Sequence, residues 1–511
     1  SEFAAAVEAA AATGGADKPP IMAGGAVLIA QRNETSYFEI IKIAALPAIL
    51  YYLSVGYMVY LRAVSRGLLG VSADELPPWR RILLRLHFLL PIPFMVYYLM
   101  IGDSAFLAAF KTICLIMMLK STDLLNKIQT PWSGRTARPF LFLSILFGVF
   151  SYYFGLRVGA PFAWFADTLR GLNLGDALLW TVTGYLALKL GEIVLAAILS
   201  PPAANPSPSP QPAEEGEAPP ESGPALFTRL GESFVELVKV TWISLEAGAK
   251  NTLIVGCIAT VLGILLSCAT QSDLSGRISI LLTDFSFGLL PLTILWVIVA
   301  GYVVGMGLPI TASYVVLVIF GVIALTNLGV PTLTAHLISF WVAVVSAVTP
   351  PVALAAYAAS AIAVSDPVTT GFQALKLASW IFIMPFLFVY TPLLHTGTTI
   401  ENPGTTIDIV ITFIACLLGI VGWAGWLEGF FTKKTTGLER FLLLFSSLLL
   451  LMPVQSFFAY IFSLEAYIFS FQREYQIPIY AYALGAALLG LAFLLQRARG
   501  EESLDVAETP A

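Results

Sequence analysis

Two apolar segments of this chain are related to each other, and a pair of prolines interrupts each of them. The first is Thr13–Met22, which is followed by an apolar run, a polar loop and the motif Phe38–Ala44. The second is Ser346–Ala353, which is followed by an Ala-rich run, a polar loop and the matching motif Phe372–Ala378. Proline lacks a backbone N–H and clashes with the preceding helical turn. The sequence therefore predicts two repeats, each built around a helix that is broken in its middle.

The composition places these segments in a lipid bilayer. Of the 511 residues, 58% are hydrophobic and 12% are charged, and the mean hydropathy is +0.84, whereas soluble domains carry about 25% charged residues. A membrane-spanning helix needs about 20 mostly apolar residues. Such runs recur at Phe38–Leu61, Ile82–Ile101, Ala105–Leu119, Phe140–Gly155, Ala177–Leu199, Thr252–Thr270, Leu289–Leu325, Leu333–Val364, Ala374–Leu394, Ile407–Trp426, Phe441–Phe462 and Ile477–Leu495. The predicted fold class is an all-α polytopic membrane protein.

Basic residues indicate how the repeats are oriented, because cytoplasmic loops are enriched in Lys and Arg. Clusters of basic residues follow several apolar runs, at Arg62–Arg85, Lys120–Arg138, Lys433–Arg440 and Arg497–Arg499. All of them fall on one side of the membrane if Leu289–Leu325 is a hairpin and Leu333–Val364 is a single broken crossing. The first broken helix then runs outward and the second inward. The two repeats are therefore predicted to be inverted, with a cytoplasmic C-terminus.

The predicted hairpin has a Gly-rich tip, Gly305–Ser313, in which Gly305, Gly307 and Pro309 favour a turn. Non-helical backbone at membrane depth occurs only where protein or a water-filled cavity satisfies its polar groups. Helix ends beside such breaks carry unpaired carbonyls, which suit a cation, or unpaired N–H groups, which suit a carboxylate. Inverted repeats with discontinuous helices are typical of secondary transporters. We therefore predict one shared binding site where the tip and the two breaks meet.

Three stretches resemble a known family: GMGLPITASYVV from Gly305, SAVTPPVALAAYAASAIA from Ser346 and FAAAVEAAAATGG from Phe3. They are similar to the large permease subunit of tripartite ATP-independent periplasmic (TRAP) transporters, and most of all to fused permeases that work with TAXI-type binding proteins. The resemblance covers the N-terminal part and the chain from Asn251 toward the C-terminus. It implies an inverted-repeat, elevator-type fold of the ion transporter superfamily, with a hairpin and discontinuous helices.

The resemblance also implies a function. A Na⁺ or H⁺ gradient would drive uptake of a small organic anion, a carboxylate, that a periplasmic TAXI-type binding protein delivers. The permease would lie in the inner (plasma) membrane of a bacterium or archaeon as a multi-pass protein in contact with the lipid bilayer. No cofactor besides the coupling ion and no nucleic-acid partner is expected. The alternative is a stand-alone sodium- or proton-coupled carboxylate symporter of a related elevator family, which would need no binding protein.

The breaks and the hairpin tip supply the predicted site residues. The substrate-binding residues are Thr13, Gly14, Gly15, Lys18, Pro19, Thr311, Ser313 and Pro350. The cation-binding residues are Gly305, Gly307, Ser346, Thr349 and Asp17, the first four of which would hold a Na⁺ ion. Hydroxyls beside a helix break are suitable cation ligands. For Ser346 and Thr349 the alternative is a hydrogen bond back to a helical carbonyl.

Asp17 and Lys18 depart from the family pattern, which has uncharged residues just before the proline pair. An ionisable group at the centre of a membrane helix costs about 2.5 to 3.5 kcal/mol on insertion scales, and by default it marks function or a partner. Lys18 is predicted to attract the substrate carboxylate, and Asp17 to coordinate Na⁺ or to carry a proton. The alternative is that the two adjacent charges neutralise each other in a water-filled cavity.

The predicted organisation follows the repeats. Residues 1–61 are the remnant of the first transport repeat, 62–138 are scaffold helices and 139–200 are extra membrane helices. Residues 201–225 are a Pro/Ser/Glu-rich cytoplasmic linker and 226–250 an interfacial helix. Residues 251–395 are the second transport repeat, 396–500 are C-terminal membrane helices expected to be added scaffold, and 501–511 are a disordered tail. Because the first repeat lacks the hairpin of the second, we expect a missing N-terminal part or small membrane subunit.

The sequence does not support an enzyme or an ATP-driven pump. It contains no HExxH zinc motif, no Ser/His/Asp grouping within the apolar runs and no GxxxxGK[ST] P-loop. The three histidines, His87, His336 and His395, show no metal-ligand spacing. The four cysteines lie inside apolar runs, where they are read as small hydrophobic residues. We therefore predict that the chain is not an enzyme.

Overall fold

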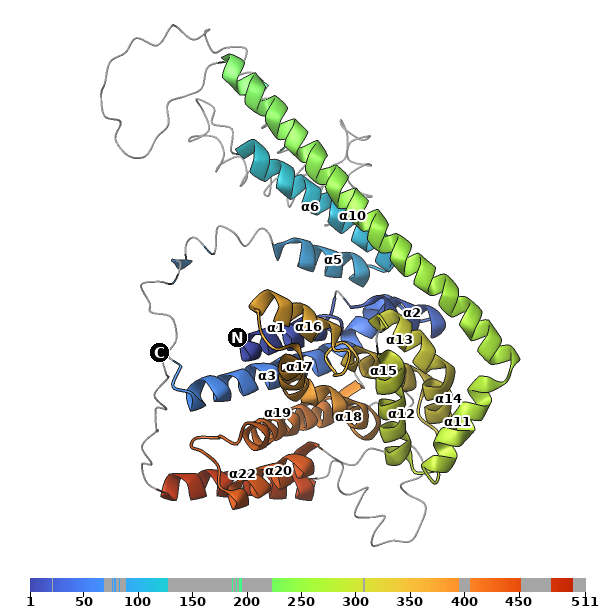
Figure 1. Ribbon diagram of the computed structural model, residues 1–511, viewed down its shortest axis with the longest axis vertical. Helices are drawn as coiled ribbons and strands as arrows, with labels where there is room; N and C mark the ends of the chain where they lie inside the picture. Colours follow the sequence, from blue (N-terminus) through green and yellow to red (C-terminus); the bar gives the residue numbers. More distant parts are fainter. Residues whose placement is uncertain are drawn as a thin grey trace, which may run out of the picture. The chain divides into compact units, whose positions relative to one another are not determined.

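A computed structural model describes residues 1–20, 22–68, 89–126, 223–306, 308–394, 405–451 and 479–499, with a few isolated positions between these ranges. Within these residues the regular structure is helical, apart from an isolated bridge between Phe430 and Lys434 (Figure 1). The chain divides into two compact units, Ser1–Leu76 with Cys257–Ala511, and Pro77–Gly256. The predicted all-α class is confirmed for this part of the chain.

Five of the described helices are long and apolar enough to cross a membrane. They are Tyr37–Ser65, Ile310–Asn327, Pro367–Tyr390, Thr406–Glu428 and Ile479–Ala498. Other apolar helices are only 10–17 residues long, among them Leu290–Gly305, Thr332–Val345 and Leu354–Ala363. Because a crossing needs about 20 residues, these short helices cross only as parts of larger elements. They are pieces of the hairpin and of the second broken helix.

The first broken helix consists of α1 (Glu2–Gly14) and α2 (Gly24–Arg32). Helical hydrogen bonding cannot continue through Pro19 and Pro20, because neither has a backbone N–H. A backbone hydrogen bond instead spans the break, from Ala23 N to the Ala16 carbonyl at 2.8 Å. The following helix is α3 (Tyr37–Ser65), whose first turn is capped by the Ser36 side chain.

The second broken helix consists of α15 (Thr332–Val345) and α16 (Leu354–Ala363). Ala355 N donates to the Ala347 carbonyl at 3.0 Å across this break, a bond like that in the first repeat but with its donor one residue later. The peptide bond between the two prolines is cis in both breaks. The two proline pairs therefore produce the same local structure, as the sequence predicts.

The capped helix after each break is also repeated. After the second break the Asp366 carboxylate accepts a hydrogen bond from Thr369 N at 2.7 Å and caps the next helix. The chain then continues through α17 (Pro367–Leu377), η4 (Ala378–Phe382), α18 (Met384–Tyr390) and η5 (Pro392–Leu394). The equivalent of α3 is thus a crossing assembled from shorter pieces.

The predicted hairpin is confirmed. Its arms are α12 (Leu290–Gly305) and α13 (Ile310–Leu317), and the second arm continues as η3 (Val318–Val322) and α14 (Ile323–Asn327). The two arms pack against each other and both pack against α15. Ahead of the hairpin lies α11 (Leu274–Phe285), an element that the apolar runs do not predict.

The two broken helices pack in opposite directions. α1 lies against α16 and α17, whereas α2 lies against α13 and α15 (Figure 1). The first half of one broken helix therefore contacts the second half of the other, which is the order that antiparallel segments produce. Both breaks consequently lie between the same two groups of helices: α1, α16 and α17 form one group, and α2, α13 and α15 form the other. This agrees with the inverted repeats predicted from the basic residues.

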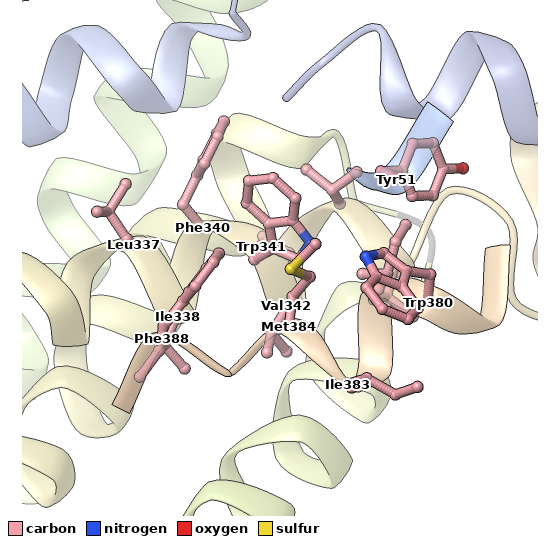
Figure 2. Close-up of a cluster of buried hydrophobic side chains, with 14 of the residues drawn as sticks. Tyr51, Leu337, Ile338, Phe340, Trp341, Val342, Trp380, Ile383, Met384 and Phe388 are labelled. Atoms are coloured by element: carbon pink, nitrogen blue, oxygen red, sulfur yellow. The ribbon is translucent and has the colours of Figure 1, made fainter. Parts of the chain in front are cut away.

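The core of this unit is centred on α15, in which every residue from Leu333 to Val345 is buried. A helix that is hydrophobic on all sides is expected at the centre of a bundle. Figure 2 shows Trp341 of α15 beside Phe388 of α18, and their rings meet edge to face at 5.2 Å. Trp380 of η4 is also fully buried in this cluster. The first half of the second broken helix is therefore held inside the core.

Three helices follow the second repeat: α19 (Thr406–Glu428), α20 (Gly437–Leu451) and α22 (Ile479–Ala498). α20 packs closely on a row of glycines in α19. A Cβ atom added to Gly419 would lie 2.4 Å from Leu451 Cδ2, and one added to Gly422 would lie 2.5 Å from Ser447 Oγ. Small residues let membrane helices approach closely, so these glycines set the spacing of the C-terminal bundle, which we define as α19, α20 and α22.

The unit Pro77–Gly256 contains α5 (Pro91–Met100), α6 (Ala105–Asn126) and the first part of α10 (Gly223–Gln271). The predicted interfacial helix 226–250 does not end at residue 250, because α10 is one continuous helix of 49 residues. No proline interrupts it after Pro224. The extra helices 139–200, the linker up to residue 222, the tail 501–511, Gly307 and His395 lie outside the described residues, apart from isolated positions.

We expect Gly419→Ala to destabilise the C-terminal bundle. The added methyl group would overlap Leu451, and overpacking of this kind costs about 1–3 kcal/mol. Thermal unfolding of the detergent-solubilised protein should therefore begin at a lower temperature. Gly490→Ala in α22 is the matched control, because a Cβ atom there meets no atom of the described structure within 4 Å. Equal unfolding temperatures for the two variants would contradict the close packing.

Candidate functional site

The hairpin tip lies directly against the second break. A Cβ atom added to Gly305 would lie 2.5 Å from Ser346 Cβ, 3.1 Å from Ser346 Oγ and 3.5 Å from Ser313 Oγ. Only glycine allows the backbone of α12 to approach the break this closely. Tyr302, three residues before Gly305, donates a hydrogen bond to the Pro350 carbonyl. The hairpin tip is thus in direct contact with the second break.

The hydroxyls of the second break bond to the helix they belong to. Ser346 Oγ donates to the Ala343 carbonyl at 2.7 Å, and Thr349 Oγ1 donates to the Val345 carbonyl. Hydrogen bonds of this kind, back to a helical carbonyl, are the alternative to cation binding considered for Ser346 and Thr349. They use the hydroxyl protons but leave lone pairs on both oxygens, so either oxygen can still be a cation ligand. Ser313 Oγ is fully buried and has no hydrogen-bond partner among the described residues.

Tyrosines of α3 complete the first break. Tyr51 donates to the Ala10 carbonyl at 2.7 Å, and Tyr52 donates to the Ala11 carbonyl at 3.1 Å. Ala11 is one of the last four residues of α1, whose carbonyls a helix leaves without intrahelical partners, and Ala10 precedes it. A Cβ atom added to Gly14 would lie 2.1 Å from the Tyr51 ring. The ring therefore packs on the glycine backbone at the end of α1.

Thr13 and Gly15 lie in the same turn. Thr13 Oγ1 donates to the Ala9 carbonyl at 2.8 Å, and Gly15 N donates to the Ala12 carbonyl at 3.0 Å. After the prolines, the Pro20 carbonyl accepts a hydrogen bond from Tyr37 at 3.1 Å. Backbone carbonyls on both sides of Pro19 therefore accept hydrogen bonds.

Asp17 and Lys18 point into different surroundings. Asp17 is only 2% exposed, and its Oδ1 atom has no hydrogen-bond partner among the described residues. Lys18 is exposed, and its Nζ atom lies 5.4 Å from the centre of the Tyr52 ring. No ion pair between them is found within the described part of the chain. The predicted roles of Asp17 and Lys18, and the alternative of mutual neutralisation in a water-filled cavity, stay predictions.

The second arm of the hairpin faces both breaks. A Cβ atom added to Gly24, at the start of α2, would lie 3.2 Å from Thr311 Oγ1. Ser313, two residues later, lies beside Gly305 near the second break. Thr311 therefore contacts the first repeat, and Ser313 belongs to the cluster at the second break. The N-terminal turn of α13 connects the two halves of the candidate site.

The helix ends around the breaks differ in polarity. α2, α13 and α16 begin there, so their free N–H groups carry partial positive charge, whereas α1, α12 and α15 end there and present carbonyls. N-terminal ends suit an anion and C-terminal ends suit a cation. The arrangement can hold both ligands within one site. No group of three or more His, Cys, Asp or Glu side chains suited to a metal ion occurs in the described ranges.

Several residues of the site were not predicted from the sequence. Tyr51, Tyr52 and Tyr302 bond to carbonyls of the two broken helices, and Tyr357 donates to the Pro351 carbonyl at 2.5 Å. Their signal in the sequence is weak, because tyrosine is also common at membrane interfaces. His336 is a structural residue: its Nδ1 lies 2.8 Å from the Tyr314 hydroxyl between α15 and α13.

The chain was compared with known protein families once this geometry was established. It matches the family model described as tripartite ATP-independent periplasmic transporter, DctM component, over residues 1–151 and 226–401. These ranges contain both broken helices and the hairpin. The chain belongs to this transporter family. No curated protein and no solved structure matches it.

The match confirms the resemblance at the level of the large TRAP permease component. It identifies the permease as a multi-pass membrane protein of a transporter family, and not of an enzyme family. A system of this family includes a periplasmic binding protein and a small substrate. The matched ranges leave out most of the predicted extra helices and the linker. They also end before α19, so the C-terminal bundle lies outside them.

We expect Gly305→Ala to disturb the site, because its methyl group would overlap Ser346. Overpacking costs about 1–3 kcal/mol, and a loss of 1.4 kcal/mol in ligand affinity corresponds to roughly a tenfold change. Uptake by the reconstituted permease should fall accordingly. The matched control is Gly56→Ala in α3, where an added Cβ atom meets no described atom within 4 Å. Wild-type uptake by both variants would show that the tip does not need its close contact.

Proposed function

We propose that this permease carries out secondary active uptake of a small organic anion, a carboxylate, which a periplasmic binding protein of the TAXI type delivers. The observation that carries the proposal is the meeting of the hairpin tip with the second break, beside an antiparallel first break. Two oxygen atoms there, Asp17 Oδ1 and Ser313 Oγ, are buried without partners among the described residues. Buried polar atoms normally have partners, so a bound ligand would satisfy them.

The proposed cation site uses the carbonyl ends and the hydroxyls. Gly305 and the neighbouring Gly307 would contribute backbone carbonyls, and Ser346 and Thr349 would contribute hydroxyl oxygens. Oxygen atoms of this kind suit Na⁺. Asp17 lies in the other break and would either balance the charge of the cation or carry a proton. The coupling ion is therefore proposed as Na⁺ or H⁺.

The proposed substrate site uses the opposite helix ends. Thr311 and Ser313 lie in the first turn of α13, where free N–H groups favour a carboxylate. Thr13, Gly14, Gly15, Pro19 and Pro350 would line the same space from the breaks. Lys18 is exposed and carries the positive charge that attracts the anion. Movement of the repeats as one body across the membrane, the elevator mechanism, would carry this site from one side to the other.

The partner requirement is tested by reconstituting the complete permease in proteoliposomes. Uptake of labelled carboxylates should appear only when the binding protein is added together with an inward cation gradient. Equal uptake without the binding protein would favour a stand-alone carboxylate symporter. Absence of gradient-driven uptake in the presence of both would contradict the proposed function.

Lys18→Met should weaken recognition of the anion while leaving the fold intact, because the side chain is exposed. A hydrogen bond to a charged group contributes about 1.5–3 kcal/mol, so the apparent KM for the substrate should rise about tenfold or more. Initial uptake rates over a range of substrate concentrations measure this change. The control is Lys42→Met, because Lys42 of α3 already pairs with Glu39 at 2.5 Å. An unchanged KM for Lys18→Met would remove Lys18 from the substrate site.

Asp17→Asn should reduce the response to the driving gradient, because an amide neither balances a cation nor carries a proton. Uptake is measured with a Na⁺ gradient alone and with a pH gradient alone. The gradient that drives the wild type and no longer drives the variant identifies the coupling ion. If the variant responds to both gradients as the wild type does, Asp17 has no part in coupling.

A further inference from the structure

The C-terminal bundle is attached to both transport repeats by α19. This helix packs along α3 of the first repeat (Figure 1). It also packs against η5 of the second repeat. Its residues Cys416, Ile420 and Ala424 belong to the same buried cluster as Val55 and Met58 of α3. The contact is therefore part of the main hydrophobic core, and not a loose surface contact.

Glu428, the last residue of α19, stabilises this contact with two ion pairs. Its side chain is 4% exposed. Arg62 Nη1 of α3 lies 3.4 Å from Glu428 Oε2, and Lys376 Nζ of α17 lies 3.0 Å from Oε1. The Lys376 contact joins opposite charges, but its geometry is not that of a hydrogen bond. One buried carboxylate thus pairs with a cation from each repeat.

A second polar contact lies one turn earlier on α19. Trp423 Nε1 donates to Ser379 Oγ of η4 at 3.0 Å. The indole N–H and the carboxylate both point to helices that follow the breaks. α19 is therefore held to the repeats by apolar packing, by a hydrogen bond and by charge.

The buried charge makes this attachment hard to break. Removing one partner of a buried ion pair leaves an uncompensated charge in a medium of low dielectric constant, which is strongly unfavourable. If α3 and α17 slid past a stationary α19 during transport, Glu428 would lose both partners in every cycle. A carboxylate at such a position is compatible with transport only if all three helices move together.

The rest of the bundle is fixed to α19. Gly425 and the two other glycines of α19 pack on α20. Ser446 Oγ of α20 donates to the Gly485 carbonyl of α22 at 2.7 Å, and Arg499 Nη2 lies 2.7 Å from Glu439 Oε2. Whatever moves α19 therefore moves α20 and α22 as well.

We propose that the C-terminal bundle is part of the moving transport body, and that the buried Glu428 carboxylate joins it to both repeats through its ion pairs. This reverses the expectation that residues 396–500 are static scaffold. The proposal rests on the proposed function, because it presumes that the repeats move during uptake. It also gives a role to a segment outside the family match, which ends at residue 401.

Cross-linking tests the proposal. Cys114, Cys257, Cys268 and Cys416 are first replaced by Ala in the complete permease, and the pair Ser379→Cys and Trp423→Cys is introduced. A short bifunctional methanethiosulfonate then links the two positions, and peptide mass spectrometry confirms the link. A monofunctional methanethiosulfonate on the same protein is the control. If the bundle moves with the repeats, the linked protein keeps at least about half of the uptake of the control, because no relative motion is blocked.

Loss of uptake to about a tenth or less on linking, with full activity in the control, would overturn the proposal, because it would show that α19 and η4 must move apart. Failure of the proposed function is distinguishable, because the cysteine-free parent would then show no uptake with or without the reagent. Spin labels at the exposed positions Phe372 of α17 and Ile414 of α19 provide a second measurement. Their distance distribution should stay the same with and without substrate and gradient, and a second, shifted population would also overturn the proposal.

Discussion

The structure depends on satisfying the backbone of two helices that are broken where the surroundings are apolar. Each proline pair removes N–H groups and leaves carbonyls without intrahelical partners, which is costly away from water. Two kinds of hydrogen bond act around the breaks. Backbone bonds from Ala23 N to the Ala16 carbonyl and from Ala355 N to the Ala347 carbonyl span them. Tyrosine hydroxyls bond to nearby carbonyls: those of α3 donate to the C-terminal part of α1, and Tyr302 and Tyr357 donate to the two proline carbonyls of the second break. The helices that follow the breaks and the hairpin must therefore pack against them, and this requirement organises the whole unit.

Antiparallel packing then combines the two breaks into one site. Because α1 lies on α16 while α2 lies on α15, neither repeat forms the site alone. The first turn of α13 connects them, with Thr311 beside the first repeat and Ser313 beside the second break. Some backbone carbonyls beside the breaks accept hydrogen bonds from tyrosines, whereas Asp17 Oδ1 and Ser313 Oγ have no partner among the described residues. Buried polar atoms normally have partners, and these two oxygens are the atoms on which the proposed binding of a ligand rests.

The packed core of the protein extends further along the chain than the family match does. The match covers the repeats and ends before α19, yet α19 contributes residues to the main buried core and carries the carboxylate that pairs with both repeats. The boundary of the family model is therefore not a boundary in the hydrophobic core. A transport body that includes the bundle would have a larger apolar surface to move through the membrane than the matched repeats alone.

The sequence by itself determined the local breaks. Pro19, Pro350 and the Gly-rich tip predicted where the helices stop, because missing N–H groups and glycine flexibility act within a few residues. The all-α class and the antiparallel order of the repeats also followed, from apolar run lengths and from basic loops. Only the tertiary structure decided which side chains complete the site and which helices belong together. Tyr51 and Glu428 act on partners far away in sequence. These features depend on long-range packing, for which the local pattern of residues carries no signal.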